Sequence, residues 1–104
     1  MTEDFKFKKV QEIVLYNITR MKKLCSVKDI QSFTGDTLSE KQIYNALENL
    51  ERRKLIIKIK KKTDFLAGLN IKELDRIKKI IGVHWEANWE EDWKRIIGGL
   101  HESP

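Results

Sequence analysis

The chain is short of the residues that interrupt or cross-link a protein. Its 104 residues include one proline, Pro104, and no stretch rich in proline, glycine or serine that would separate two domains. Cys25 is the only cysteine, which excludes an intrachain disulfide and a zinc site built from several cysteines. A single thiol fits a reducing compartment, and we expect a cytoplasmic protein with one hydrophobic core.

Long apolar runs are also missing. No segment comes near the roughly 20 apolar residues that a membrane-spanning helix needs. The opening "MTEDFKFKKV" lacks the apolar core of a secretion signal, and we expect no membrane partner. The apolar residues, 40% of the chain, recur at regular spacing instead of in blocks, which favours a folded domain over a disordered chain.

Residue sets that carry catalysis do not stand out either. His84 and His101 are isolated, and no group of ligands has the spacing of a metal site. We find no serine–histidine–aspartate set, no glycine-rich phosphate loop and no pair of catalytic carboxylates. We therefore expect that the protein is not an enzyme and that it holds no cofactor and no metal.

Charge is abundant and unevenly distributed. The net charge is +5, but residues 1–81 hold 19 Lys and Arg against 11 Asp and Glu, whereas residues 82–104 hold 2 against 5. A basic body with an acidic tail indicates a polyanionic partner, and nucleic acid is the commonest one. The alternative is that a basic surface only keeps the protein in solution.

Two amphipathic helices are predicted at the start of the chain. Apolar residues recur at helical spacing over residues 5–23. Residues 26–35 form a shorter helix, in which Ser26 is placed to cap the first free N–H groups and Gly35 can take the left-handed conformation that ends it.

The third predicted helix spans residues 39–53 and has the clearest local signals. Ser39 and Gln42 have the spacing of a capping box at its start. Its inner face holds Ile43, Ala46, Leu47 and Leu50. Its opposite face is polar and holds Lys41, Gln42, Tyr44, Asn45, Glu48, Asn49 and Arg52.

A β-hairpin is predicted directly after this helix. In "LIIKIKKK", Ile57 and Ile59 alternate with Lys58 and Lys60, which is the period of a strand with one buried face. "KKTD" can turn the chain, and "FLAGLN" reads as the return strand, where Gly68 allows a kink or a close approach. The hairpin therefore carries lysines at its tip.

Two helices are expected after the hairpin. Asn70 opens the first, with Glu73 at the capping-box position, and Gly82 ends it. The second covers "HWEANWEEDWKRIIGGL", and Gly98 with Gly99 is expected to end it. One side of this second helix is apolar and holds Trp85, Trp89, Trp93, Ile96, Ile97 and Leu100.

The stretch "SVKDIQSFTGDTLSEKQIYNALENLERRKLI" resembles the core of winged helix-turn-helix transcription regulators. The matching residues are Val27, Ile30, Gly35, Leu38, Ser39, Ile43, Tyr44, Leu47, Leu50, Leu55 and Ile56. The resemblance covers residues 8–81 and assigns no subfamily. Lys54 stands where the family has glycine, which predicts a less sharply turned helix end, and the turn that follows Gly35 is longer than usual.

The resemblance implies a mainly α fold with a small β-hairpin (α+β) that binds double-stranded DNA. It implies a winged-helix domain over residues 1–82 and an added C-terminal helix over residues 83–104. In such proteins the third helix, here residues 39–53, is the recognition helix, and the hairpin, here residues 58–64, is the wing. The candidate DNA-binding residues are Ser39, Lys41, Gln42, Tyr44, Asn45, Asn49, Arg52, Arg53, Lys58, Lys60, Lys61 and Lys62.

The chemistry of these side chains suits a duplex. Asn and Gln can form paired hydrogen bonds with adenine, Lys can donate to guanine, and Tyr can touch a phosphate or a thymine methyl group. Lysines on a wing would bind phosphates with release of counterions. The alternatives are an ordinary solvated helix face, lysines that protect an exposed strand from edge pairing, and arginines that oppose the negative helix end.

The tryptophan face of the last helix is too apolar to stay in water, at about 25 cal/mol per Å². It can fold back on the domain, meet a second copy of the chain, or bind another protein. We favour a homodimer, because a two-fold dimer presents two recognition helices to a symmetric site. The predicted dimer residues are Trp85, Trp89, Trp93, Ile96 and Ile97.

Three functions follow in order of preference. The first is a sequence-specific DNA-binding regulator, repressor-like and dimeric. The second is a protein-binding winged-helix module within a transcription or replication assembly. The third is a nucleoid or plasmid-maintenance protein that binds DNA with little sequence preference.

Overall fold

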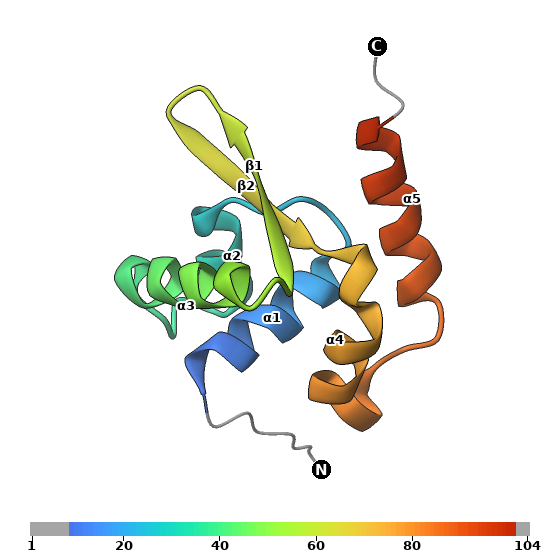
Figure 1. The fold of residues 1–104 in the computed structure, drawn as a ribbon. Helices are drawn as coiled ribbons and strands as arrows, with labels where there is room; N and C mark the ends of the chain where they lie inside the picture. Colours follow the sequence, from blue (N-terminus) through green and yellow to red (C-terminus); the bar gives the residue numbers. More distant parts are fainter. Residues whose placement is uncertain (1–8, 102–104) are drawn as a thin grey trace.

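The structure is a computed structural model that describes residues 9–101. Within these residues the order is α1 (Val10–Met21), α2 (Val27–Phe33), α3 (Glu40–Arg52), β1 (Ile56–Lys61), β2 (Asp64–Leu69), η1 (Ile71–Glu73), α4 (Leu74–Ile81), η2 (Gly82–His84) and α5 (Trp89–His101). Figure 1 shows the hairpin rising from the first three helices, with α5 upright on its other side. The predicted fold class is confirmed. Residues 5–8 of the first predicted helix lie outside the described range.

The core forms where α1, α2 and α3 meet the base of the hairpin. From α1, Val14, Leu15 and Ile18 are completely buried. The two buried polar side chains of this helix bond to carbonyls one turn back: Thr19 Oγ1 donates to Leu15 O at 2.9 Å, and Asn17 donates to Ile13 O at 2.7 Å. Each of these side chains therefore has a partner for a donor group within its own helix.

The starts of α2 and α3 are fixed by their own residues. Ser26 and Asp29 form a capping box, in which each side chain accepts a hydrogen bond from the other residue's backbone N–H. Ser39 and Gln42 form the same arrangement at the start of α3, as predicted. Gly35 has a φ of 70°, so the predicted left-handed end of the second helix is also confirmed.

The end of α3 is turned as sharply as glycine would turn it. Lys54 has a φ of 66°. Its N–H donates to Glu51 O at 2.9 Å, and the N–H of Leu55 donates to Leu50 O at 3.0 Å, which is the paired pattern of a left-handed helix end. The prediction of a less sharply turned end was wrong, because burial of both leucines holds the backbone in this conformation although residue 54 has a side chain.

Replacing Lys54 by glycine should therefore stabilise the protein. The left-handed conformation costs an L-residue about 1–2 kcal/mol, and the greater freedom of glycine in the unfolded chain offsets part of the gain. We expect the free energy of unfolding in urea to rise by about 0.5–1 kcal/mol. Lys79→Gly, on the exposed side of α4, should lower it instead by up to about 1 kcal/mol. Equal losses in both variants would contradict this account of Lys54.

The hairpin has two distinct faces, because successive residues of a strand point to opposite sides. The strands pair antiparallel, from Ile56 opposite Leu69 to Lys61 opposite Asp64. The α3 face holds Lys58, Lys60, Phe65 and Ala67. The α5 face holds Ile57, Ile59, Leu66 and Gly68. Both faces are therefore partly covered, whereas the sequence pattern predicted one buried face.

The base of the hairpin is tied to the segment between α1 and α2. Cys25 N–H donates to Ala67 O at 2.8 Å, and Ala67 N–H donates to Cys25 O at 2.7 Å. At the other edge Asn70 donates from its amide to Lys54 O at 2.8 Å. These bonds fix the direction in which the wing leaves the domain.

α5 packs on the α5 face of the hairpin through Trp93. This side chain is 0% exposed, and its indole N–H donates to Thr19 O at 3.1 Å, in the last turn of α1, where carbonyls lack helical partners. Gly68 makes the approach possible, since a Cβ there would lie 3.3 Å from Trp93 Cζ3 and 2.7 Å from Leu24 Cδ2. The close approach predicted for Gly68 is confirmed.

This packing corrects the predicted tryptophan ridge. Trp89, Trp93 and Ile97 are 4%, 0% and 3% exposed within a single chain, so they are not free to form the dimer surface predicted for them. Trp85 and Ile96 are half-buried against the same core. Helical spacing correctly grouped Trp89, Trp93 and Ile97 on one face, but that face is covered by the chain's own hairpin and α1.

The segments around α4 and α5 also differ from the sequence expectation. Asn70 caps the short turn η1 by accepting from Lys72 N–H at 3.1 Å, and Glu73 pairs with Arg76 instead of closing a box. Helix α5 begins at Trp89, because residues 82–84 form η2 and Trp85 is extended. The helix also continues past Gly98 and Gly99 to residue 101.

Candidate nucleic-acid interface

The candidate interface begins with the exposed side of α3. Ile43, Ala46, Leu47 and Leu50 face the core. Helical periodicity therefore puts Lys41, Asn45, Glu48 and Arg52 along the line that points most directly away from the domain. Lys41, Asn45, Glu48 and Arg52 are all exposed.

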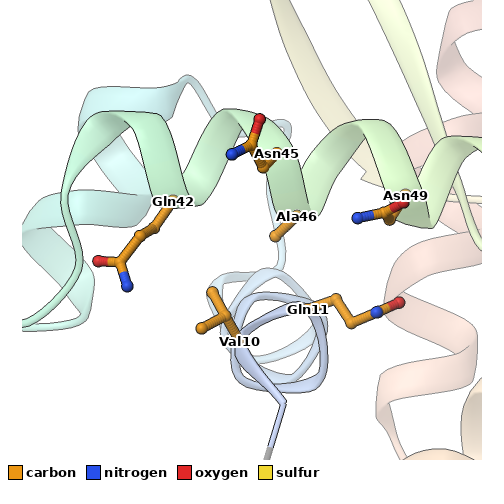
Figure 2. A pocket seen from close by; sticks show the side chains of 6 residues that line it. All are labelled: Val10, Gln11, Gln42, Asn45, Ala46 and Asn49. Carbon is orange, nitrogen blue, oxygen red and sulfur yellow. The ribbon is translucent and has the colours of Figure 1, made fainter.

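The side of α3 next to α1 carries amides. Figure 2 shows α3 crossing α1, with Ala46 facing α1 and Asn45 on the outer side. Between the two helices lies a shallow pocket of about 240 Å³, lined by Val10, Gln11, Gln42, Asn45, Ala46 and Asn49. Three of its polar lining residues, Gln42, Asn45 and Asn49, are candidate DNA-binding residues.

Five of the predicted DNA-binding side chains are already hydrogen-bonded around α3, namely those of Ser39, Gln42, Asn49, Arg52 and Arg53. Gln42 accepts from Ser39 N–H at 2.9 Å through Oε1, so a paired contact with adenine would have to share this oxygen with the cap. Asn49 Oδ1 accepts from Arg52 at 2.8 Å. Arg53 donates to Gln11 Oε1 at 2.7 Å, which joins the end of α3 to α1.

Asn45 and Lys41 differ from these neighbours. Among residues 9–101 no hydrogen bond or ion pair engages either side chain. Asn45 keeps a carbonyl oxygen and an amino group, which can meet N6 and N7 of adenine together. It is therefore the amide of α3 best placed for base recognition.

The other side of α3 contacts the wing. The ring of Tyr44 packs edge-on against Phe65 of β2, with centroids 6.0 Å apart. Glu51 pairs with Lys58 of β1 at 3.3 Å, and the ammonium of Lys58 lies 4.8 Å from the centroid of the Phe65 ring. Tyr44 and Lys58, both predicted to touch DNA, therefore hold the wing against the helix.

The tip of the wing is cationic and open to solvent. Lys60, Lys61 and Lys62 are exposed, and within the described residues none of them forms an ion pair. Lys60 is on the α3 face by the strand alternation, whereas Lys61 is on the α5 face. Lys62 turns the chain with a φ of 39°. Part of this charge is thus directed to the same side as α3.

The acidic helix α5 lies apart from the exposed side of α3. Figure 1 shows α5 on the side of the hairpin away from α2 and α3. On α5, hydrogen bonds from Lys78 and then Lys94 hold the pKa of the Glu90 carboxyl below its ordinary value. Asp92 pairs with Lys22 at 3.6 Å. These acids neutralise Lys22, just beyond the end of α1, and cations of α4 and α5; within residues 9–101 they form no ion pair with Lys60, Lys61 or Lys62.

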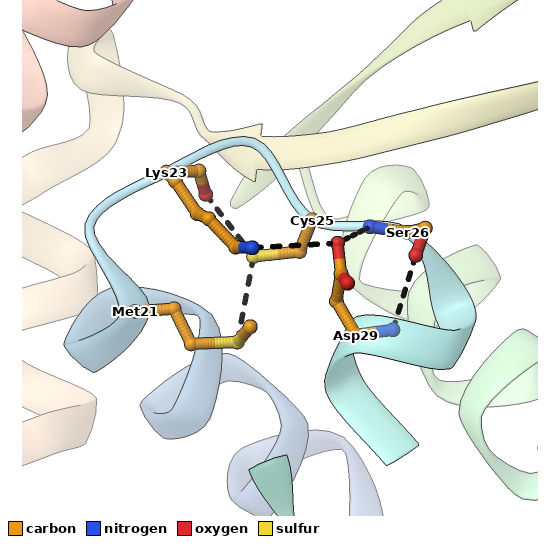
Figure 3. A network of polar contacts seen from close by, with 5 residues as sticks. All are labelled: Met21, Lys23, Cys25, Ser26 and Asp29. Carbon is orange, nitrogen blue, oxygen red and sulfur yellow. Dashed lines mark hydrogen bonds and ion pairs between the residues drawn. The ribbon is translucent and has the colours of Figure 1, made fainter. Parts of the chain in front are cut away.

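Cys25 has a structural environment (Figure 3). Its thiol donates to Lys23 O at 3.0 Å and contacts Met21 Sδ at 3.5 Å. Burial, with a further contribution from the Asp29 carboxylate and a partial offset by Lys23, raises the pKa of this thiol to about 12. The thiol is therefore protonated at neutral pH and suited to packing rather than to redox chemistry.

A metal site and a membrane-spanning helix are not seen in residues 9–101. No three His, Cys, Asp or Glu side chains there are grouped to hold a metal ion. Over the same residues, none of the helices combines the length and the apolar character required to cross a membrane.

Comparison with known proteins gives one likeness of fold. No protein-family model matches the chain, and no curated protein matches its sequence. The structure is similar to that of BpsR from Bordetella bronchiseptica, whose DNA binding is regulated by 6-hydroxynicotinic acid. The TM-score is 0.50 at 16% identity, over 95% of this chain and 78% of that chain. At this identity the likeness shows the fold alone.

Proposed function

We propose that this protein is a sequence-specific DNA-binding regulator of the winged-helix type. The observation that carries the proposal is the contact between α3 and the wing. The contacts of Tyr44 with Phe65 and of Glu51 with Lys58 join the exposed side of α3 to the hairpin, which supports a single surface formed by Lys41, Asn45 and the lysine tip. The fold likeness to BpsR, a DNA-binding protein, supports the same reading.

In this proposal α3 enters the major groove and the wing follows the backbone. The groove admits an α-helix, and the residues of its N-terminal half reach base edges. Asn45 and Lys41 would read bases, and Lys60, Lys61 and Lys62 would bind phosphates. Residues 1–82 act as the DNA-binding unit, and α5 packs against the base of the wing through Trp93.

The proposal has two further parts. The protein acts as a homodimer, and it represses transcription by occupying a promoter. A two-fold dimer would match a symmetric DNA site. Its surface differs from the one first expected, because Trp89 and Trp93 are covered within the chain. Trp85 and Ile96, which are half-buried, and Leu100, which is 38% exposed, stay accessible to a second chain.

Gel shifts across a salt series test the proposal against its alternatives. A duplex enriched from a random pool should bind more tightly than a random duplex, and both affinities should fall with salt. A steep salt dependence without preference would indicate a non-specific DNA binder. No binding at physiological salt would favour a protein-interaction module.

Asn45→Ala should erode the preference and leave the salt dependence unchanged. The side chain is uncharged and bonds to a base, so its loss removes about 1–3 kcal/mol of discrimination but no phosphate contact. Asn88→Ala is the matched control, because Asn88 is exposed in the turn before α5. The assignment of Asn45 fails if the two variants select duplexes equally well.

A further inference from the structure

One acidic side chain on the outward line of α3 has no cation beside it. Glu48 is exposed and lies one turn beyond Asn45 on the same side of the helix. The other acids of α3 are accounted for. Glu51 pairs with Lys58 at 3.3 Å, and Glu40 lies in the first turn, where the helix dipole stabilises a negative charge.

Arg52, the residue best placed to pair with Glu48, is bonded to another side chain. Arg52 follows at the i+4 position, where an ion pair with Glu48 would form on an isolated helix. Its guanidinium donates instead to Asn49 Oδ1 at 2.8 Å. Among residues 9–101 no ion pair neutralises Glu48, although seven others are present there.

A bare carboxylate at this position has a restricted choice of neighbours on a duplex. Phosphates repel it, and so do O6 and N7 of guanine and O4 of thymine, which are all acceptors. The donors in the major groove are N6 of adenine and N4 of cytosine. Adenine presents the acceptor N7 beside N6, whereas cytosine presents N4 alone, so a carboxylate accepts from cytosine N4 with less repulsion. Glu48 lies beside Asn45 on the outward line of α3 and is also next to Tyr44 and Glu51, the two side chains that contact the wing. An outward side chain of a helix in the major groove faces the base edges.

We propose that Glu48 is a specificity-determining residue that accepts a hydrogen bond from cytosine N4. This inference rests on the proposed function and names what its site reads. Three residues of helix advance by about 4.5 Å, close to the rise of about 3.4 Å per base pair. The cytosine read by Glu48 is therefore in the base pair adjacent to the adenine read by Asn45.

Selection of bound duplexes from a random pool tests this, with the full chain and with Glu48→Ala, which removes the accepting oxygens. The native protein should enrich an adenine with a cytosine in the adjacent pair. Glu48→Ala should lower the discrimination for that cytosine by roughly 10-fold to 100-fold and leave the adenine enriched. It should also bind random duplexes more tightly, because one repulsive charge is removed. Glu91→Ala, at an exposed acid on α5, should change neither property.

The outcomes distinguish failure of the role of Glu48 from failure of the proposed function. If Glu48→Ala enriches the same cytosine as the native chain, Glu48 does not read that base, while sequence-specific binding stands. Binding without any base preference would overturn the role of Glu48 and leave duplex binding. If the native chain binds no duplex, the proposed function itself fails. Circular dichroism of Glu48→Ala checks that the exposed substitution leaves the fold intact.

Discussion

Changing Lys60, Lys61 and Lys62 together to alanine should weaken binding to every duplex and flatten its dependence on salt. All three side chains are exposed and unpaired within the described residues, so each can displace a counterion from a phosphate. The slope of log affinity against log salt should decrease in magnitude by roughly 3. Base preference should persist, because lysine–phosphate contacts carry no sequence information.

A matched variant separates this effect from the loss of net charge. Lys72, Lys79 and Lys94 are also exposed, and they lie on η1, α4 and α5. Their replacement by alanine removes the same charge from elements other than α3 and the wing. The measurement is the salt slope in gel shifts with a random duplex. Equal slopes for the two triple variants would contradict the assignment of the wing.

Replacing Trp93 by alanine should cost about 3–5 kcal/mol of stability, because it empties the largest completely buried site between α5, α1 and the hairpin. A small domain has only about 5–15 kcal/mol to lose. The midpoint of urea denaturation should therefore fall steeply, and the unfolded fraction in buffer should rise.

Trp93→Phe provides the comparison for this variant. It keeps an aromatic ring over Gly68 but removes the indole donor to Thr19 O, so a smaller loss of about 1–3 kcal/mol is expected. A surface tryptophan that served only a dimer would behave differently. In that case Trp93→Ala would halve the sedimentation mass and leave the urea midpoint of the monomer unchanged.

The sequence predicted the elements whose signals are local. The Ser39–Gln42 box and the apolar spacing after it define α3 within one residue at each end, and alternation of isoleucine with lysine marks β1. The sequence predicted a close approach at Gly68, but it did not predict which side chain would approach. Trp93, which fills that space, lies in α5 and bonds to Thr19 in α1. Helical spacing cannot show what covers a face when the cover is so distant in the chain.

The site was predicted as a set of residues but not as a network. Gln42 was assigned both a cap and a base contact, and its Oε1 is already engaged in the cap. Lys58 and Tyr44 were grouped with the DNA contacts, yet they touch Glu51 and Phe65. Which polar side chains stay unpaired depends on the register of the hairpin against α3, and that register is not encoded locally.

Mapping backbone amide shifts of the labelled full chain on addition of a duplex tests the central claim most directly. The account predicts that the signals of Lys41, Asn45 and Glu48 shift together with those of residues 60–62, while the outer side of α5 around Glu91 is unaffected. Shifts confined to α5, or shifts on α3 without the wing, would contradict a single DNA-binding surface.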